Sequence, residues 1–173
     1  MDHLIRMILD RHMPLLSIRT LTLVTAAGAA TTGGALFAFS TFVMPGLRRL
    51  TASEGIVAMN AINRAAPSSP LFMTALLGTA AASIGLGAVA INRHDHPSST
   101  YVLIGAALYL VGIAVTAAYH VPRNDALLLV DPSGPGAAAT WRRYAHGWTL
   151  WNHVRAATSL AGAAMYVLAV RAD

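Results

Sequence analysis

The sequence predicts an all-α protein, a bundle of four transmembrane helices that forms a single membrane domain over residues 1–173. Two observations predict this fold. Hydrophobic residues make up 55% of the chain and charged residues only 11%, whereas charged residues are roughly 25% of an ordinary soluble domain. Long segments carry no charge at all, and a soluble domain of this size buries too little surface to hide so many apolar side chains. A lipid bilayer is therefore the expected environment of the helices.

The first three helices follow from segments without charged residues. Residues 20–47 and 65–92 contain no Asp, Glu, Lys or Arg, and in residues 97–122 the only titratable group besides tyrosines is His120. Each segment exceeds the roughly 20 residues that span a bilayer as a helix. We place transmembrane helices at about 18–43, 70–91 and 101–120. Between the first two, residues 54–64 mix apolar and polar side chains in the pattern of a short amphipathic helix.

The fourth helix draws ionisable side chains into the membrane. Only 15 residues separate Arg155 from Arg171, which is about 22 Å of helix, and the apolar core of a bilayer is about 30 Å thick. The predicted span is therefore 150–170, which carries Asn152, His153 and Arg155 towards or into the membrane. Ionisable residues at that depth are costly and indicate a functional site.

This last helix is predicted to extend beyond the membrane, beginning near Ala137 after the turn-rich segment 131–136. Aromatic and polar residues recur along it at steps of three and four, which places them on one helical face. They are Trp141, Tyr144, Trp148, Asn152 and Arg155, with Arg142, His146 and His153 on a neighbouring face. An interfacial aromatic belt is the alternative interpretation of the Trp and Tyr residues.

Polar residues from three segments are expected to converge at one end of the bundle, because the fourth helix returns from the side on which the third helix ends. The candidates are Asn60, Asn63 and Arg64 from the first connection, His120, Asn124 and Asp125 from the second, and His146, Trp148, Asn152, His153 and Arg155 from the last helix. A pocket between helices near the membrane surface suits a flat apolar ligand.

Three chemical roles are predicted within this group. His153 is the candidate general base, because imidazole titrates near neutrality. Arg155 is the candidate for stabilising an anion, since its guanidinium stays charged and offers a planar fork of donors. Asn124 and Asn152 are candidates for donating hydrogen bonds to an oxygen that gains charge. The structural alternative is a satisfied polar cluster, or an Arg155 side chain that extends to the membrane surface.

The composition disfavours several classes of function. The chain contains no cysteine, so disulfides, thiolate catalysis and cysteine metal sites are excluded. The formal charge of +5 does not indicate nucleic acid as a partner, because no long basic face lies between the apolar segments. No metal is predicted, since His146 and His153 lie about 10 Å apart along one helix, too far to share a zinc ion. A metal site that joins His120 to one histidine of the last helix stays open.

Two sequence patterns resemble the DUF1772 family, whose members include anthrone oxygenases. One is Val121-Pro122-Arg123-Asn124-Asp125-Ala126-Leu127 followed by Trp141, and the other is Trp148-x-x-Trp151-Asn152-His153-Val154-Arg155. Residues 59–64 and 39–45 are also similar, so that the resemblance extends over about residues 20–170. Asp125 stands where the family usually has a second asparagine.

The resemblance implies a membrane-bound oxygenase that converts a small anthrone-type aromatic to a quinone, with O₂ as co-substrate and no cofactor. Such a reaction needs a base, an anion-stabilising group and an apolar slot. The predicted catalytic residues are His153, Arg155, Asn152 and Asn124, and the predicted substrate-binding residues are Trp148, Trp151, Tyr119, His120 and Asn63.

The alternative function is that of a non-enzymatic membrane protein that binds a small apolar ligand or a partner protein. The predicted location is the bacterial inner membrane, with both termini in the cytoplasm. The many small residues in the helices are compatible with a homo-oligomer, although they serve equally well for packing within one bundle.

Overall fold

The four-helix bundle predicted from the sequence is confirmed by a computed structural model, which describes the backbone of residues 2–172 and the side chains of residues 18–172. Four helical stretches are long and apolar enough to cross a membrane: Ile18–Leu47, Pro70–Asn92, Ser99–Leu128 and Ala137–Ala172. In this part of the chain no strand is present.

Three of the four stretches change from α-helix to π-helix and back. The first consists of α1 (Asp2–Ala38), η1 (Phe39–Val43) and α2 (Met44–Leu47). The second consists of α4 (Pro70–Met73), η2 (Thr74–Gly78) and α5 (Thr79–Asn92), and the third of α6 (Ser99–Val115), η3 (Thr116–His120) and α7 (Val121–Leu128). The fourth is α8 (Ala137–Ala172), and α3 (Ala52–Ala65) connects the first two stretches.

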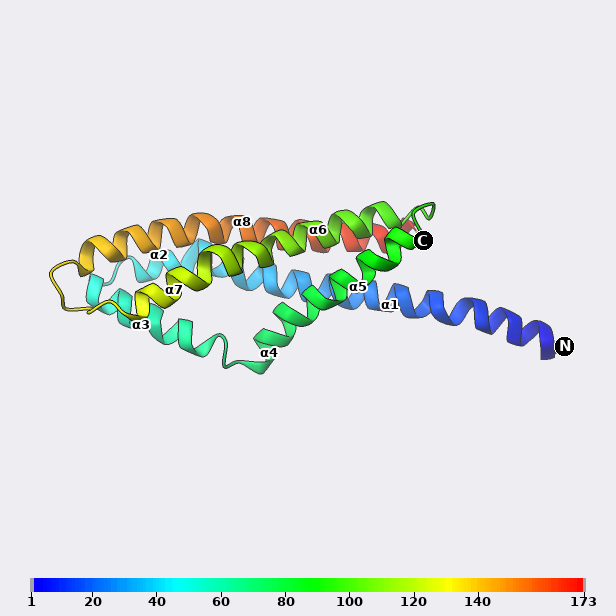
Figure 1. Ribbon diagram of the computed structural model, residues 1–173, viewed down its shortest axis with the longest axis horizontal. Helices are drawn as coiled ribbons and strands as arrows, with labels where there is room; N and C mark the ends of the chain where they lie inside the picture. The colour runs from blue at the N-terminus through cyan, green and yellow to red at the C-terminus, as the bar shows by residue number, and fades with distance from the viewer. Residues whose placement is uncertain (1, 173) are drawn as a thin grey trace.

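Helix α8 is the centre of the bundle and packs against both α1 and α6, while α5 packs mainly against α6 (Figure 1). Small residues allow the backbones to approach closely where α6 meets α8. A Cβ atom on Gly162 would lie 3.0 Å from the carbonyl oxygen of Gly105. Such contacts between small residues are the usual means of helix association in lipid.

The outer surface of the bundle is apolar. Large side chains such as Val24, Phe42 and Ile84 are more than half exposed, although they lie within the spanning stretches. Polar side chains such as Ser83, His120 and Asn152 are instead almost completely buried. This distribution matches a lipid environment, in which every buried polar group must find its partner inside the protein. The chain is an integral membrane protein.

The third helix is longer than the sequence predicted. Its expected end was at residue 120, two residues before Pro122, but the helix continues through α7 to Leu128. A proline ring clashes with the carbonyl of the residue four positions earlier, and that residue, Ala118, lies inside η3. The wider π-turn accommodates the ring. The first helix likewise continues past Pro45, beyond its expected end at residue 43. The residue four positions before Pro45 is Thr41, which lies inside η1.

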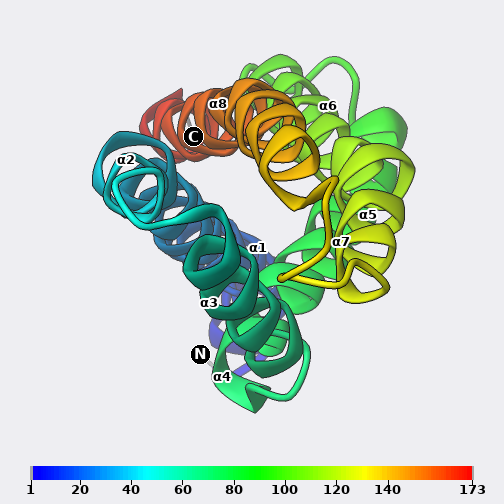
Figure 2. The ribbon, with the colours of Figure 1, turned by 90° about the vertical axis from the view of Figure 1, so that its left-hand side faces the viewer.

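The amphipathic helix expected at residues 54–64 is α3, which lies at the end of the bundle opposite the N-terminal end of α1 (Figures 1 and 2). A capping box starts it: the Thr51 hydroxyl accepts from the Glu54 backbone N–H, and the Glu54 carboxylate accepts from the Thr51 N–H. These hydrogen bonds from Thr51 hold the pKa of Glu54 below its usual range. Helix α3 then packs on α8, with Gly55 against the ring of Trp141.

This contact generates a prediction for Gly55→Ala. The added Cβ would lie 2.6 Å from the buried indole of Trp141, so the ring has to move. We expect the free energy of unfolding to fall by about 1–3 kcal/mol, the usual cost of overpacking. Gly85→Ala is the matched control, because nothing lies within 4 Å of its Cβ position. Thermal unfolding in detergent, followed by circular dichroism, compares the two; equal stability would contradict the proposed contact.

Candidate functional site

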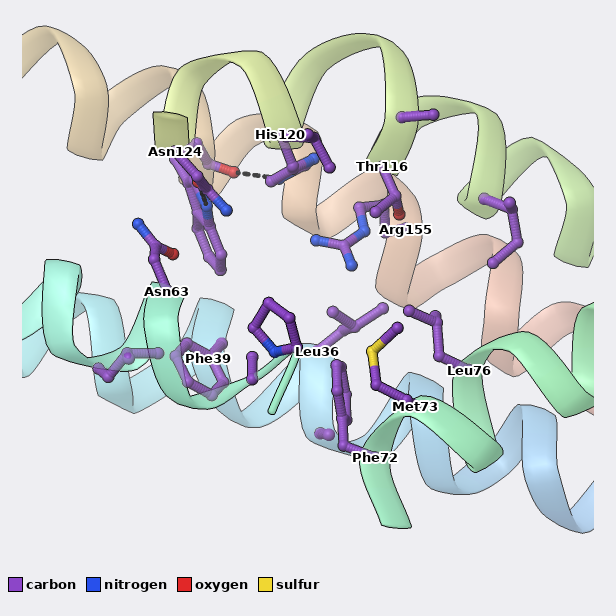
Figure 3. A pocket seen from close by; sticks show the side chains of 18 of the residues that line it. Leu36, Phe39, Asn63, Phe72, Met73, Leu76, Thr116, His120, Asn124 and Arg155 are labelled. Carbon is purple, nitrogen blue, oxygen red and sulfur yellow. Dashed lines mark hydrogen bonds between the residues drawn. The ribbon is translucent and has the colours of Figure 1, made fainter. Parts of the chain in front are cut away.

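A cavity of about 420 Å³ lies between the membrane-spanning helices, close to α3. This volume falls in the range of roughly 300–1,000 Å³ that is typical of small-ligand pockets. Figure 3 shows two different walls: Thr116, His120, Asn124 and Arg155 lie along one side, and Leu36, Phe39, Phe72, Met73 and Leu76 along the other. The cavity therefore offers an apolar slot with one polar wall.

The cavity also approaches the outer surface of the bundle. Leu77 of η2 and Val121 of α7 line it, and they are 52% and 48% exposed on the apolar exterior. These two residues belong to the second and third membrane-spanning stretches. The cavity thus extends to the apolar exterior between these two stretches, which is the surface that faces lipid in a membrane.

All three π-helical segments contribute to the cavity lining. Phe39 belongs to η1, Leu76 to η2, and His120 to η3. Side chains donate hydrogen bonds to backbone carbonyls in or just before two of these segments: Asn152 to Leu36, and Tyr109 to Leu76. π-Turns frequently mark functional sites, because the extra residue re-aims the side chains of the turn.

Arg155 is a buried cation without an anionic partner. Its side chain is 6% exposed and lines the cavity, into which its guanidinium points in Figure 3. Among the described side chains, Arg155 forms no ion pair with an acidic residue. The Arg155 Nε–H is buried and has no hydrogen-bond acceptor. A buried charge normally has a counter-charge, so an anionic ligand fits this site.

Asn152 holds Arg155 in position. Its amide nitrogen donates to the Leu36 carbonyl oxygen at 2.7 Å and to Ser40 Oγ at 2.8 Å. A backbone carbonyl only accepts hydrogen bonds, so this contact fixes the orientation of the amide. The Asn152 oxygen is thereby turned to Arg155, whose Nη1 donates to it at 3.2 Å. Asn152 is fully buried and does not line the cavity itself.

Asn124 lies farther along the polar wall and accepts two hydrogen bonds through its side-chain oxygen. The Tyr144 hydroxyl donates to it at 2.8 Å and Trp148 Nε1 at 3.2 Å. Asn63 Nδ2 in turn donates to the Tyr144 oxygen at 3.4 Å. Asn124, Asn63 and Trp148 all line the cavity. Three predicted site residues therefore form one hydrogen-bonded group, joined by Tyr144.

His120 is the histidine of the cavity, and its side chain is 1% exposed. Its Nδ1 lies 3.5 Å from the Val115 carbonyl oxygen and its Nε2 lies 3.3 Å from that of Trp148. A neutral imidazole has one N–H, so it donates to one carbonyl and keeps a lone pair beside the other.

The structure places His153, the predicted general base, outside the cavity. His153 is exposed and does not line the cavity. Successive residues of an α-helix are turned by about 100°, so a residue two positions before Arg155 points to nearly the opposite side. Trp151 also lies outside the cavity: it is 39% exposed and contacts the ring of Tyr119, which does not line the cavity either.

The remaining polar candidates also lie away from the cavity lining. Asn60 is buried and donates to the Leu127 carbonyl oxygen, which ties α3 to α7. Arg64, Asp125 and His146 are exposed. In the part of the chain with described side chains, no three His, Cys, Asp or Glu residues are grouped as a metal site would need.

Sequence reasoning missed the apolar wall of the cavity. Phe39, Phe72 and Met73 line it, but every side chain of an apolar membrane helix looks alike in a hydrophobicity pattern. Thr116 was also missed, although it lies four residues before His120 and eight before Asn124. That spacing places all three on one helical face. It is the one sequence signal from which the polar wall could have been identified.

Comparison with protein families finds a match for most of the chain. A family model described as anthrone oxygenase matches residues 58–165, from the second half of α3 into α8. The matched segment contains His120, Asn124 and Arg155 together with the second and third membrane-spanning stretches. No curated protein and no solved structure matches the chain significantly.

The contact between Asn152 and Arg155 generates a prediction for stability. Asn152→Ala removes the side-chain acceptor of the Arg155 guanidinium in the interior of the bundle. We expect a loss of about 1–3 kcal/mol in the free energy of unfolding, the cost of an unsatisfied buried polar group. The neighbouring exposed residue is the control, and His153→Ala should change stability by less than about 0.5 kcal/mol. Unfolding in mixed micelles measures both; similar values would contradict the buried network.

Proposed function

Because this chain belongs to the anthrone oxygenase family, we propose that it is a membrane-bound oxygenase that converts an anthrone-type aromatic to the quinone with O₂. One observation carries the proposal: Arg155 is a buried cation with unpaired donors at the side of an otherwise apolar cavity. The expected ligand is therefore flat and apolar, with one oxygen that becomes negatively charged.

An anthrone has these properties once it loses a proton. The carbon opposite its carbonyl group is acidic, because the electron pair of the broken C–H bond spreads over the rings to the carbonyl oxygen. The resulting enolate is a flat anion. Arg155 stabilises the oxygen of this anion, and Leu36, Phe39 and Phe72 of the opposite wall supply apolar contact to its rings. Donors that are already oriented towards a developing negative charge are usually the largest contribution to catalysis.

His120 is the proposed base. It is the histidine that lines the same wall as Arg155, and in its neutral form one ring nitrogen keeps a lone pair. His120 removes the proton, and the enolate carbon then forms a bond to O₂, which the electron pair reduces to a bound peroxide. The imidazolium returns its proton to the outer peroxide oxygen, giving a hydroperoxide.

The second half of the reaction completes the balance. The remaining proton of the same carbon leaves, its electron pair forms the new carbonyl group, and the O–O bond breaks. The hydroxide that departs combines with that proton as water. One anthrone and one O₂ therefore give one quinone and one water, and O₂ is the only oxidant in this scheme.

The first functional prediction concerns the charge of Arg155. Arg155→Met keeps a long apolar side chain but cannot stabilise the enolate, so we expect kcat/KM for anthrone oxidation to fall by about 100-fold or more. Arg155→Lys keeps the charge without the planar fork and should retain an intermediate rate. O₂ uptake by protein in nanodiscs is measured against empty nanodiscs, which gives the spontaneous rate. Unchanged turnover in Arg155→Met would remove Arg155 from the mechanism.

The second functional prediction separates the two histidines. His120→Ala removes the proposed base and should lower kcat by about 100-fold or more. His153→Ala should leave kcat within a factor of about two, because this side chain lies outside the cavity. The reverse result would make His153 the base. Tight binding of an anthrone enolate analogue by a protein without any O₂ uptake would instead support a non-enzymatic binding protein.

A further inference from the structure

The side-chain amide of Asn124 has a fixed orientation. Trp148 Nε1 lies 3.2 Å from Asn124 Oδ1, and an indole nitrogen only donates hydrogen bonds. The atom facing Trp148 must therefore be the oxygen of the amide. If the amide were rotated by half a turn, its NH₂ group would face the N–H of Trp148. Neither of these two donors would then have an acceptor.

The Tyr144 hydroxyl is a second donor that fixes the same orientation of the Asn124 amide. Asn63 Nδ2 donates to the Tyr144 oxygen, and Tyr144 uses its own proton to donate to Asn124 Oδ1. In these two linked hydrogen bonds, Asn63 donates to Tyr144 and Tyr144 donates to the Asn124 oxygen. The Asn124 NH₂ group has no hydrogen-bond partner among the side chains that the structure describes, and Asn124 lines the cavity. What this residue offers a ligand is a pair of N–H donors.

These donors lie at a distance from the cation. Thr116, His120 and Asn124 follow one another at intervals of four residues along the polar wall, and Figure 3 shows the Arg155 guanidinium next to Thr116. Eight residues of helix rise by about 12 Å, so the Asn124 amide and the Arg155 guanidinium lie near opposite ends of the wall. His120 lies between them.

We propose that Asn124 is a specificity residue, which selects ligands that carry a second, uncharged oxygen at the end of the ring system away from the anionic oxygen. The inference rests on the proposed function in one respect, because it takes the cavity as the substrate site. The anionic oxygen binds Arg155 and the second oxygen accepts from Asn124. A ligand without that oxygen covers the amide donors and leaves them unpaired, which is the strongest form of discrimination available to a buried polar group.

Tyr144 is a positioning residue in this arrangement. It is buried and does not line the cavity, so it does not touch the ligand. Its hydroxyl acts by holding the Asn124 oxygen away from the cavity. Substrates of the inferred class are therefore flat aromatics with oxygen functions at both ends, such as anthrones that bear a hydroxyl or methoxy group on an outer ring.

The experiment uses two anions that cannot undergo the oxygenase reaction. 2-Naphthoate has a carboxylate at one end only, and 6-methoxy-2-naphthoate adds an oxygen at the other end that accepts a hydrogen bond but cannot donate one. Equilibrium dialysis against full-length protein in nanodiscs of neutral phosphatidylcholine measures both affinities, with empty nanodiscs as the reference. We expect the methoxy compound to bind about five- to tenfold more tightly.

The variants test which residue produces this preference. Asn124→Asp keeps an oxygen that accepts from Trp148 and Tyr144 but has no N–H donor, so the ratio of the two affinities should fall to about one. Tyr144→Phe should lower the ratio in part, because Trp148 still holds the amide. Asp125→Asn is the matched control next to Asn124; this residue is exposed, and the ratio should stay at the wild-type value.

Equal affinities in the wild-type protein, no binding of either naphthoate, or a preference that survives in Asn124→Asp would each overturn the inference. The ratio compares two ligands on the same protein, so a general loss of folding or of membrane insertion does not change it. Anthrone turnover is measured separately. A protein that shows the methoxy preference without any O₂ uptake would refute the oxygenase and leave the selectivity of Asn124 in place.

Discussion

A guanidinium group buried among membrane helices is the constraint on which this site depends. An arginine at the centre of a bilayer costs about 2.5–3.5 kcal/mol even on the lower scale derived from membrane insertion. Arg155 neither reaches the membrane surface nor pairs with a carboxylate: it is 6% exposed, its described polar partner is the amide oxygen of Asn152, and its Nε–H is unpaired. A charge kept under these conditions fits a binding role better than a structural one, because an apolar residue would fill the same space at lower cost.

The helices around Arg155 are irregular in a way that creates the cavity. A regular α-helix with proline at position 45 or 122 would clash with its own backbone, and the π-turns η1 and η3 relieve both clashes. The extra residue in each turn also re-aims the side chains that follow it. Phe39 and His120 lie in these turns and face the cavity. The prolines therefore do more than allow the helices to continue, since the turns that they require border the space in which a ligand fits.

Part of this structure follows from the sequence and part does not. The four spans follow from lengths of apolar sequence and α3 from its amphipathic pattern, and the short interval between Arg155 and Arg171 predicts that Arg155 lies towards or in the membrane. His153 lies outside the cavity that Arg155 lines, because residues two positions apart on a helix face away from each other, and nearness in sequence does not show this. The π-turns leave no periodic signal, and the apolar wall at Phe72 and Met73 cannot be distinguished from lipid-facing residues without coordinates.

The small number of polar groups in the cavity suits the chemistry proposed for it. An anthrone enolate reacts with O₂ without further activation, so the protein has only to favour ionisation and to manage two protons. In the proposed reaction, Arg155 lowers the energy of the enolate by stabilising its oxygen. O₂ is itself apolar and reaches an apolar cavity beside lipid more readily than a hydrated one. The apolar wall of Leu36, Phe39 and Phe72 leaves little room for water beside a bound ligand, which strengthens the attraction between Arg155 and the enolate. The proposed reaction therefore asks the cavity for one base, one cation and one oriented amide, with O₂ as the oxidant.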